Sequence, residues 1–181
     1  MRSNIYGRHS DFSVQVRTLA GRRRGYPDVM ATVTRTMQAP ADQVYAILAD
    51  GWTYSDWVVG TAHIRDVDAA WPAVGSKLHH KIGPWPLSLR DASTVLAADP
   101  GRSLTLRAGL WPLGEATVRI ELVPVDDETT RVTMHEDFHA GPLHWAKNKI
   151  NDLALHGRNV EALRRLAELA ENCRRPGSVP R

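Results

Sequence analysis

The residues Met134–His139 read MHEDFH and contain H-E-x-x-H, the spacing with which zinc metalloproteases bind their metal and place a general base. That chemistry requires a helix, where side chains four residues apart share a face. Here the motif follows a β-branched, alternating run and is ended by AGP, a pattern that predicts a strand. In a strand, His135 and His139 would lie about 13 Å apart, too far to share one zinc ion, with Glu136 on the opposite face. We therefore predict that this segment is not a zinc protease site.

Strand alternation separates the side chains that we expect to face the protein interior. In the segment above, Glu136 shares a face with Val132, Met134 and Phe138, so a carboxylate is predicted in an apolar wall. By the same alternation, His80 and Asp91 group with apolar neighbours in two earlier strands. The two strands in between have wholly apolar inner faces. A mostly apolar interior with a few convergent polar groups is the usual composition of a small-molecule pocket.

Length and composition predict one intracellular domain. A chain of 181 residues suits a single domain with a sizeable core. The only cysteine, Cys173, cannot pair within the chain, which fits a reducing compartment, so we expect a cytoplasmic location. No apolar run approaches the roughly 18 residues that span a bilayer, and the N-terminus lacks the apolar core of a secretory signal. No Cys/His cluster has zinc-finger spacing, and we predict neither a metal nor another cofactor.

The net charge of +3 is unevenly distributed. Residues 1–28 contain six arginines against Asp11 and Asp28, a net of +4, which leaves −1 on the remainder. The cluster GRRRG could contact nucleic acid or anionic lipid, but three arginines in a glycine-bounded, weakly apolar segment are more often a solvated tail. We predict a flexible basic extension over 1–29, a folded domain over 30–173, a tail over 174–181, and no nucleic-acid partner.

Hydrophobic periodicity predicts the elements of the domain. A β-branched run predicts a strand over about 31–38; then a helix begins at Pro40, with Val44, Ile47 and Leu48 on one face, and a short helix passes through YSDWV. Alternating runs separated by short turns predict six further strands in antiparallel hairpins, over about 62–68, 76–82, 87–97, 102–110, 115–123 and 130–139.

The last predicted element is a helix over about 146–172 whose apolar stripe changes along its length. The stripe is formed by Leu155, Ala162, Leu163, Leu166, Ala170 and Cys173. Toward the helix N-terminus the same stripe meets Asp152, His156 and Asn159. An unpaired buried polar group costs about 1–3 kcal/mol. These three side chains therefore either reach solvent past the sheet edge or face an internal cavity, and periodicity leaves both alternatives open.

This order, β-α-α-β6-α, resembles the SRPBCC or START-like superfamily, especially its bacterial polyketide cyclase/dehydrase branch. The resemblance covers about 30–173 and depends on the order and spacing of individually weak stretches. It implies an α+β helix-grip fold, in which a curved antiparallel sheet wraps around a long C-terminal helix and a cavity between them accepts a hydrophobic or amphipathic small molecule. The stretches are MQAPADQVYAILADGWTYSDWV (37–58), WPAVGSKL (71–78), DASTVLAADPGRSLTLRA (91–108), TRVTMHEDF (130–138) and GRNVEALRRLAELAE (157–171).

Nine residues are our candidates for the cavity wall: Trp57, His80, Asp91, Met134, Glu136, Phe138, Asp152, His156 and Asn159. Their polar members either orient a ligand, act as a general acid/base set on a poly-keto substrate, or are core polar groups paired with one another. The resemblance carries no fixed catalytic signature, so no catalytic residue is assigned.

Three functions follow as hypotheses. The first is binding of a lipid, aromatic or polyketide-like molecule; the second is a polyketide cyclase/aromatase or dehydratase; the third is a toxin-like or regulatory protein-interaction module that uses the surface and the basic tail. The sequence leaves the oligomeric state open.

Overall fold

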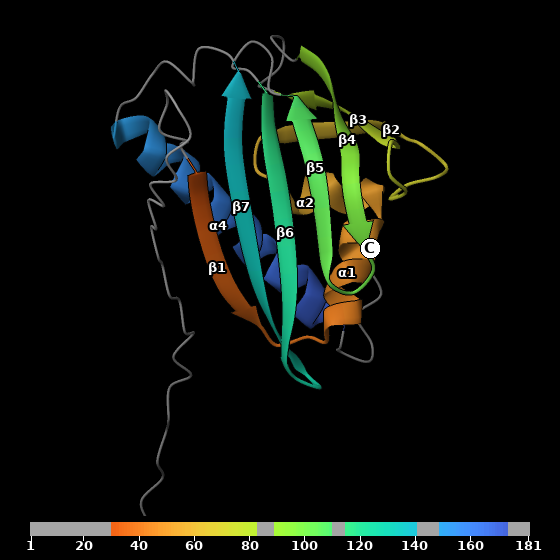
Figure 1. Ribbon diagram of the computed structural model, residues 1–181, viewed down its shortest axis with the longest axis vertical. Helices are drawn as coiled ribbons and strands as arrows, with labels where there is room; N and C mark the ends of the chain where they lie inside the picture. Colours follow the sequence, from red (N-terminus) through yellow and green to blue (C-terminus); the bar gives the residue numbers. More distant parts are fainter. Residues whose placement is uncertain (1–29, 83–88, 110–114, 141–148, 174–181) are drawn as a thin grey trace, which may run out of the picture.

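A seven-stranded antiparallel sheet wraps around one long helix in the computed structural model, which describes residues 30–82, 89–109, 115–140 and 149–173 (Figure 1). The side chains of a few residues within these ranges, such as 82, 89–90, 138–140 and 149–155, are not described. The elements are β1 (Met30–Met37), α1 (Ala41–Ala49), η1 (Gly51–Thr53), α2 (Tyr54–Trp57), β2 (Thr61–Val67), β3 (Lys77–Ile82), β4 (Leu89–Asp99), β5 (Ser103–Gly109), β6 (Glu115–Asp126), β7 (Thr129–Ala140) and α4 (Lys149–Asn172).

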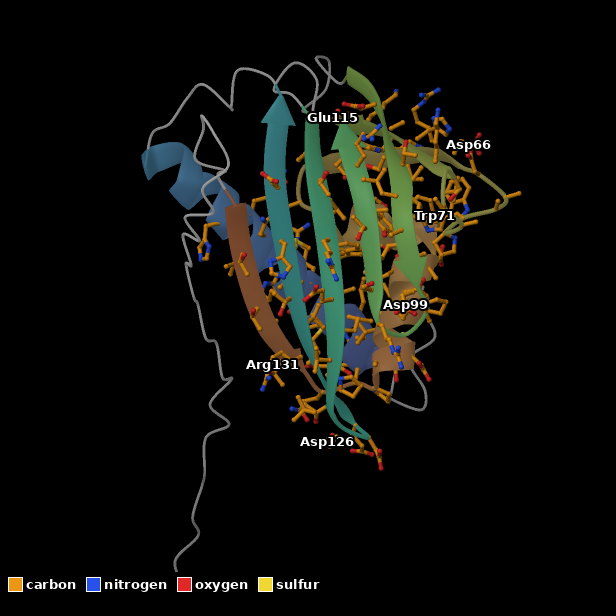
Figure 2. The ribbon with its side chains drawn as sticks, viewed as in Figure 1. Asp66, Trp71, Asp99, Glu115, Asp126 and Arg131 are labelled. Carbon is orange, nitrogen blue, oxygen red and sulfur yellow. The ribbon has the colours of Figure 1, made fainter. Side chains whose placement is uncertain are left out.

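The strands follow the order β1-β7-β6-β5-β4-β3-β2, so the first strand closes one edge by pairing with the last. Register shifts interrupt the β2–β3, β4–β5 and β6–β7 pairs, and such bulges bend and twist strands. As a result β2 and β3 run across behind the other strands, while α4 crosses behind β1, β7 and β6 (Figure 1). β6 extends from Glu115 at one end of the sheet to Asp126 at the hairpin tip (Figure 2). The concave face of the sheet is thus the face that holds the helices.

The helices between β1 and β2 begin where local chemistry favours them. Pro40 precedes α1 with φ −60°, and its carbonyl accepts the amide hydrogen of Val44 at 3.1 Å. Proline is well suited to a helix start because its φ is already near the helical value. The next turn, η1, is capped by the Asp50 side chain, which accepts the amide hydrogen of Trp52 at 3.0 Å.

The core lies between the second half of α4 and the sheet. Ala162, Leu163, Leu166 and Ala170 are buried, as the apolar stripe predicts, and they pack in one cluster with Val33 and the buried face of α1. That face of α1 consists of Val44, Tyr45, Ile47 and Leu48. The stripe prediction was wrong for Cys173, which is exposed just after the helix ends at Asn172. The helical periodicity extends the apolar stripe to Cys173, but the sheet and α1 do not cover the helix that far.

The predicted α+β helix-grip architecture is confirmed. All seven strands lie within three residues of their predicted bounds, with the largest difference at the end of β6, and the long helix is observed from Lys149. The predicted extension 1–29 and tail 174–181 lie outside the described residues. Among the helices of the described ranges, none has the length and apolar character to cross a membrane.

Candidate functional site

A cavity of about 280 Å³ lies between the concave face of the sheet, α2 and the middle of α4. Its floor is apolar and comes from three adjacent strands, with Leu106 and Ala108 on β5, Val118 and Ile120 on β6, and Met134 on β7. These residues alternate along their strands with outward-facing ones. On β6 the lining residues are nearer to Glu115 than to Asp126, so the cavity lies toward the Glu115 end of the sheet (Figure 2).

A carboxylate, a guanidinium and an amide meet in one wall of this cavity. Glu136 of β7 is 1% exposed, and its two oxygens bind different residues of α4. Oε1 accepts from Nη2 of Arg158 in an ion pair, and Oε2 accepts from Nδ2 of Asn159 at 2.7 Å. We call Glu136, Arg158 and Asn159 the cavity cluster. Both carboxylate oxygens are satisfied, which is how a protein accommodates a charge that has lost its water.

A buried imidazole is found in the opposite wall. His80 of β3 is 5% exposed, and its Nδ1 lies 3.4 Å from the Leu78 carbonyl oxygen. Since a carbonyl can only accept, this contact places the proton on Nδ1 and leaves Nε2 as an acceptor. Burial lowers the pKa of His80 below its ordinary value, although the Leu78 carbonyl and the charge of Asp91 act in the other direction. The ring is therefore neutral at pH 7. Ser93, on neighbouring β4, is also buried and lines the cavity.

An aromatic group closes the cavity on the side of α2. Trp57 is 2% exposed and lines the cavity together with Tyr54, whose ring centroid lies 4.9 Å from that of Trp57. The Tyr54 hydroxyl donates to the Leu48 carbonyl at 3.1 Å, and Trp71 packs edge-on against Tyr54 at 5.5 Å. Burial raises the pKa of Tyr54, so its phenol stays protonated. These contacts hold the aromatic side chains in one arrangement.

The structure brings five of the nine candidates to the cavity: Trp57, His80, Met134, Glu136 and Asn159. Their role in ligand binding stays a prediction. Asn159 is buried and lines the cavity, so of the two alternatives for this residue the structure favours the cavity over solvent. His156 is half-buried and is not one of the lining residues. The side chains of Phe138 and Asp152 lie outside the described residues.

Asp91 is half-buried beside the cavity and is not part of its lining. It pairs across the strands with His80, so its predicted inward face is right. Its carboxylate occupies the space beside Gly109, where a Cβ atom would meet Oδ1 at 1.9 Å. Parity gives the face of a residue and not its distance from the cavity along the strand.

Arg158 is a residue of the site that sequence reasoning missed. It lies four residues before Ala162 and next to Asn159, and therefore on the edge of the apolar stripe of α4. Its side chain is 26% exposed, and its guanidinium reaches Glu136. The helical spacing was the available signal, and the usual assignment of arginine to the solvent face concealed it.

The H-E-x-x-H motif lies on β7, as the strand prediction requires. His135 points to the outer face, where its Nδ1 lies 3.1 Å from the Thr32 hydroxyl and its Nε2 lies 3.6 Å from Glu121. Glu136 faces the cavity on the other side of the sheet. Within the described part of the chain, no three His, Cys, Asp or Glu side chains are grouped so as to hold a metal ion.

This combination of a curved sheet, a long gripping helix and a cavity between them defines a START-like protein. The family model described as polyketide cyclase / dehydrase and lipid transport matches residues 28–171, and the chain belongs to this family. Among curated proteins, none matches the sequence.

Solved structures share the fold at low sequence identity. The Zhui aromatase/cyclase from Streptomyces sp. R1128 is 20% identical, with a TM-score of 0.62 and coverage of 84% of this chain and 99% of that chain. A START superfamily protein from Mycobacterium smegmatis is 17% identical, with a TM-score of 0.62 and coverage of 80% and 98%. A protein from Arthrobacter aurescens is 17% identical, with a TM-score of 0.64 and coverage of 83% and 88%.

Proposed function

We propose that this protein binds one small hydrophobic or amphipathic molecule in the cavity between α4 and the sheet. The observation that carries the proposal is the composition of the cavity wall, which combines an apolar floor with a buried, fully paired carboxylate and a neutral imidazole. Such walls are typical of small-molecule pockets, where a few polar groups orient a mostly apolar ligand. The family, whose description includes lipid transport, supports the same function.

The experiment is a titration with N-phenyl-1-naphthylamine, an uncharged dye whose fluorescence rises in apolar surroundings. We expect saturable binding of one dye per chain. Ala108→Leu should raise the Kd at least tenfold, because the added side chain fills part of the cavity floor. The matched control is Ala97→Leu, the same change at an exposed position of β4, which should leave the Kd unchanged. Absence of saturable binding, or equal binding by both variants, would contradict the proposal.

A second candidate function is a polyketide cyclase or aromatase, and the geometry of His80 favours it. The Nδ1 contact with Leu78 makes Nε2 the basic atom of a neutral ring in the cavity wall, which is the state that a general base needs. The test is incubation with the synthetic triketone 1-phenylhexane-1,3,5-trione, followed by liquid chromatography of ring-closed products. An enzyme should accelerate ring closure in a pH-dependent manner, and His80→Gln should abolish the acceleration. No acceleration by the wild-type protein would exclude this candidate for that substrate.

A cytoplasmic location stays a prediction from the single cysteine. The toxin-like or regulatory alternative would use the surface and would not depend on the cavity, so the Ala108→Leu variant also separates it from ligand binding.

A further inference from the structure

The charges that line the cavity cancel. Among the described lining residues, the ionisable groups that matter at pH 7 are Glu136, Arg158 and His80. The first two form an ion pair, and burial keeps His80 neutral. A ligand with a net charge would therefore enter an apolar site without a counter-charge, which is strongly unfavourable.

Four polar side chains of the cavity wall lie at two ends of the cavity. The wall also contains the Tyr54 and Thr61 hydroxyls and the Trp57 indole, whose buried Nε1 has no partner among the described residues. Arg158 and Asn159 lie at the β7 end, and His80 and Ser93 lie at the β3–β4 end. β5 and β6 separate these ends and contribute only apolar or backbone surface to the floor, through residues such as Leu106, Ala108, Val118 and Ile120. From β7 to the strand of His80, β3, there are four strand spacings, which correspond to about 19 Å along a flat sheet. The curvature of the sheet, and side chains that extend into the cavity, shorten that span.

The two ends differ in hydrogen-bonding character. Arg158 uses one Nη2 hydrogen bond for Glu136, and its other N–H groups have no partner among the described residues. A guanidinium carries five N–H donors and no acceptor, so the β7 end donates. At the opposite end His80 has Nδ1 directed to the Leu78 carbonyl, and its Nε2 accepts.

We propose that the cavity selects an uncharged ligand with an apolar body, a hydrogen-bond acceptor such as a ketone at the Arg158 end, and a hydroxyl group at the His80 end. This inference rests on the proposed function, since it names the ligand class of the same cavity. A volume of about 280 Å³ is at the lower end for ligand pockets, and it fits a molecule of two or three fused rings rather than a two-chain lipid.

The test uses three naphthalenes of similar size, titrated by isothermal calorimetry at pH 7.5. They are 6-acetyl-2-naphthol, its 6-methoxy analogue (2-acetyl-6-methoxynaphthalene), and the anion 6-hydroxy-2-naphthoate. We expect the hydroxy-ketone to bind tightest. The methoxy compound should bind roughly fivefold more weakly, because it cannot donate to His80, and the carboxylate at least tenfold more weakly.

Variants sharpen the assignment of the two ends. Glu136→Gln leaves Arg158 without its counter-charge, so the affinity for the carboxylate should rise at least tenfold relative to the affinity for the hydroxy-ketone. The matched control is Glu121→Gln on the outer face of the sheet, where Glu121 pairs with Arg119, and all three affinities should stay unchanged. His80→Leu should make the hydroxy and methoxy compounds bind equally.

The titrations separate failure of the proposed ligand class from failure of ligand binding in the cavity. Tightest binding of the carboxylate by the wild-type protein would overturn the inference and leave the proposed function standing. The same conclusion follows if N-phenyl-1-naphthylamine binds in the cavity and none of the three naphthalenes does. If neither the dye nor any naphthalene binds, the proposed function fails and the inference falls with it. If Glu136→Gln does not fold, the comparison of the three ligands on the wild-type protein still decides.

Discussion

α4 carries two clusters of carboxylate and guanidinium groups within a few turns, and they differ in burial. The cavity cluster joins Glu136 of β7 to Arg158 and Asn159, with the carboxylate 1% exposed. The surface cluster consists of Glu161, Arg164, Arg165 and Glu168, all on the solvent side of the same helix. Its Glu161 side chain is 34% exposed and accepts from Arg164 at 2.7 Å and from Arg165 at 2.8 Å.

The two clusters use the same chemistry with different consequences. In the surface cluster, water continues to solvate each charge, so breaking a pair changes little. In the cavity cluster, the carboxylate has exchanged its water for two protein donors. Removing one donor therefore leaves a buried charge that neither water nor the protein fully compensates. The cavity cluster also connects α4 to the sheet, whereas the surface cluster connects α4 only to itself. The comparison predicts that these clusters respond very differently to substitution.

The largest effect is expected for Arg158→Met. Loss of the guanidinium leaves Glu136 buried with Asn159 as its remaining donor, and the free energy of unfolding should fall by roughly 3 kcal/mol at pH 7. Urea denaturation followed by circular dichroism measures it. The control is the double variant Glu136→Leu/Arg158→Met, which removes both charges and should recover most of the loss. If the double variant is as unstable as the single one, the ion pair is not the source of the effect.

A smaller loss of stability is expected for Asn159→Leu. Arg158 still neutralises Glu136, so the free energy of unfolding should fall by roughly 1 kcal/mol, the value of one lost hydrogen bond. Ligand affinity should fall further, by more than tenfold for 6-acetyl-2-naphthol. The reason is that the Glu136 carboxylate then depends on Arg158 alone, so more of the Arg158 N–H groups bind Glu136 and fewer are available to the ligand. Equal losses of stability and affinity would indicate that Asn159 is only a paired core residue.

A pH dependence is expected from His80. Because burial lowers its pKa in the folded state, the unfolded chain binds this proton more readily once the pH falls below about 6.5. The stability is therefore complete above that pH and decreases as the pH drops toward the lower folded-state pKa. His80→Gln should reduce this slope, measured as the difference in unfolding free energy between pH 7.5 and pH 5.5. Asp91 and His79 remain in both proteins, so an identical slope would show that His80 does not titrate as inferred.

Much of the fold and part of the site were predictable because the strands obey strict alternation. Met134 and Glu136 share the cavity face of β7, as their spacing of two requires, and both are confirmed as buried. The long helix was equally clear from its apolar stripe, and Leu163 and Leu166 are fully buried.

The remainder depended on positions that no local pattern specifies. Asp91 has the predicted face but is not one of the cavity-lining residues, and its carboxylate fills the space beside Gly109. Arg158 joins the site because β7 presents Glu136 to it from 22 residues away in sequence. A partner at that distance leaves no trace in the periodicity of α4, where arginine at a stripe edge normally faces water.

The smallest effect is expected for Glu161→Gln in the surface cluster. Hydrogen bonds from Arg164 and then Arg165 lower the pKa of Glu161 to about 2, so its contribution is present at pH 7 and is lost as the pH falls from about 4.5 toward 2. Solvent exposure makes that contribution small, and the substitution should lower the Tm at pH 7 by no more than about 1 °C. In 1 M NaCl, where the Debye length is about 3 Å, the difference from the wild type should vanish. A loss as large as that of Arg158→Met, or one that persists in salt, would mean that burial does not separate the two clusters. The ion pairs of the whole helix would then have to be treated as one network.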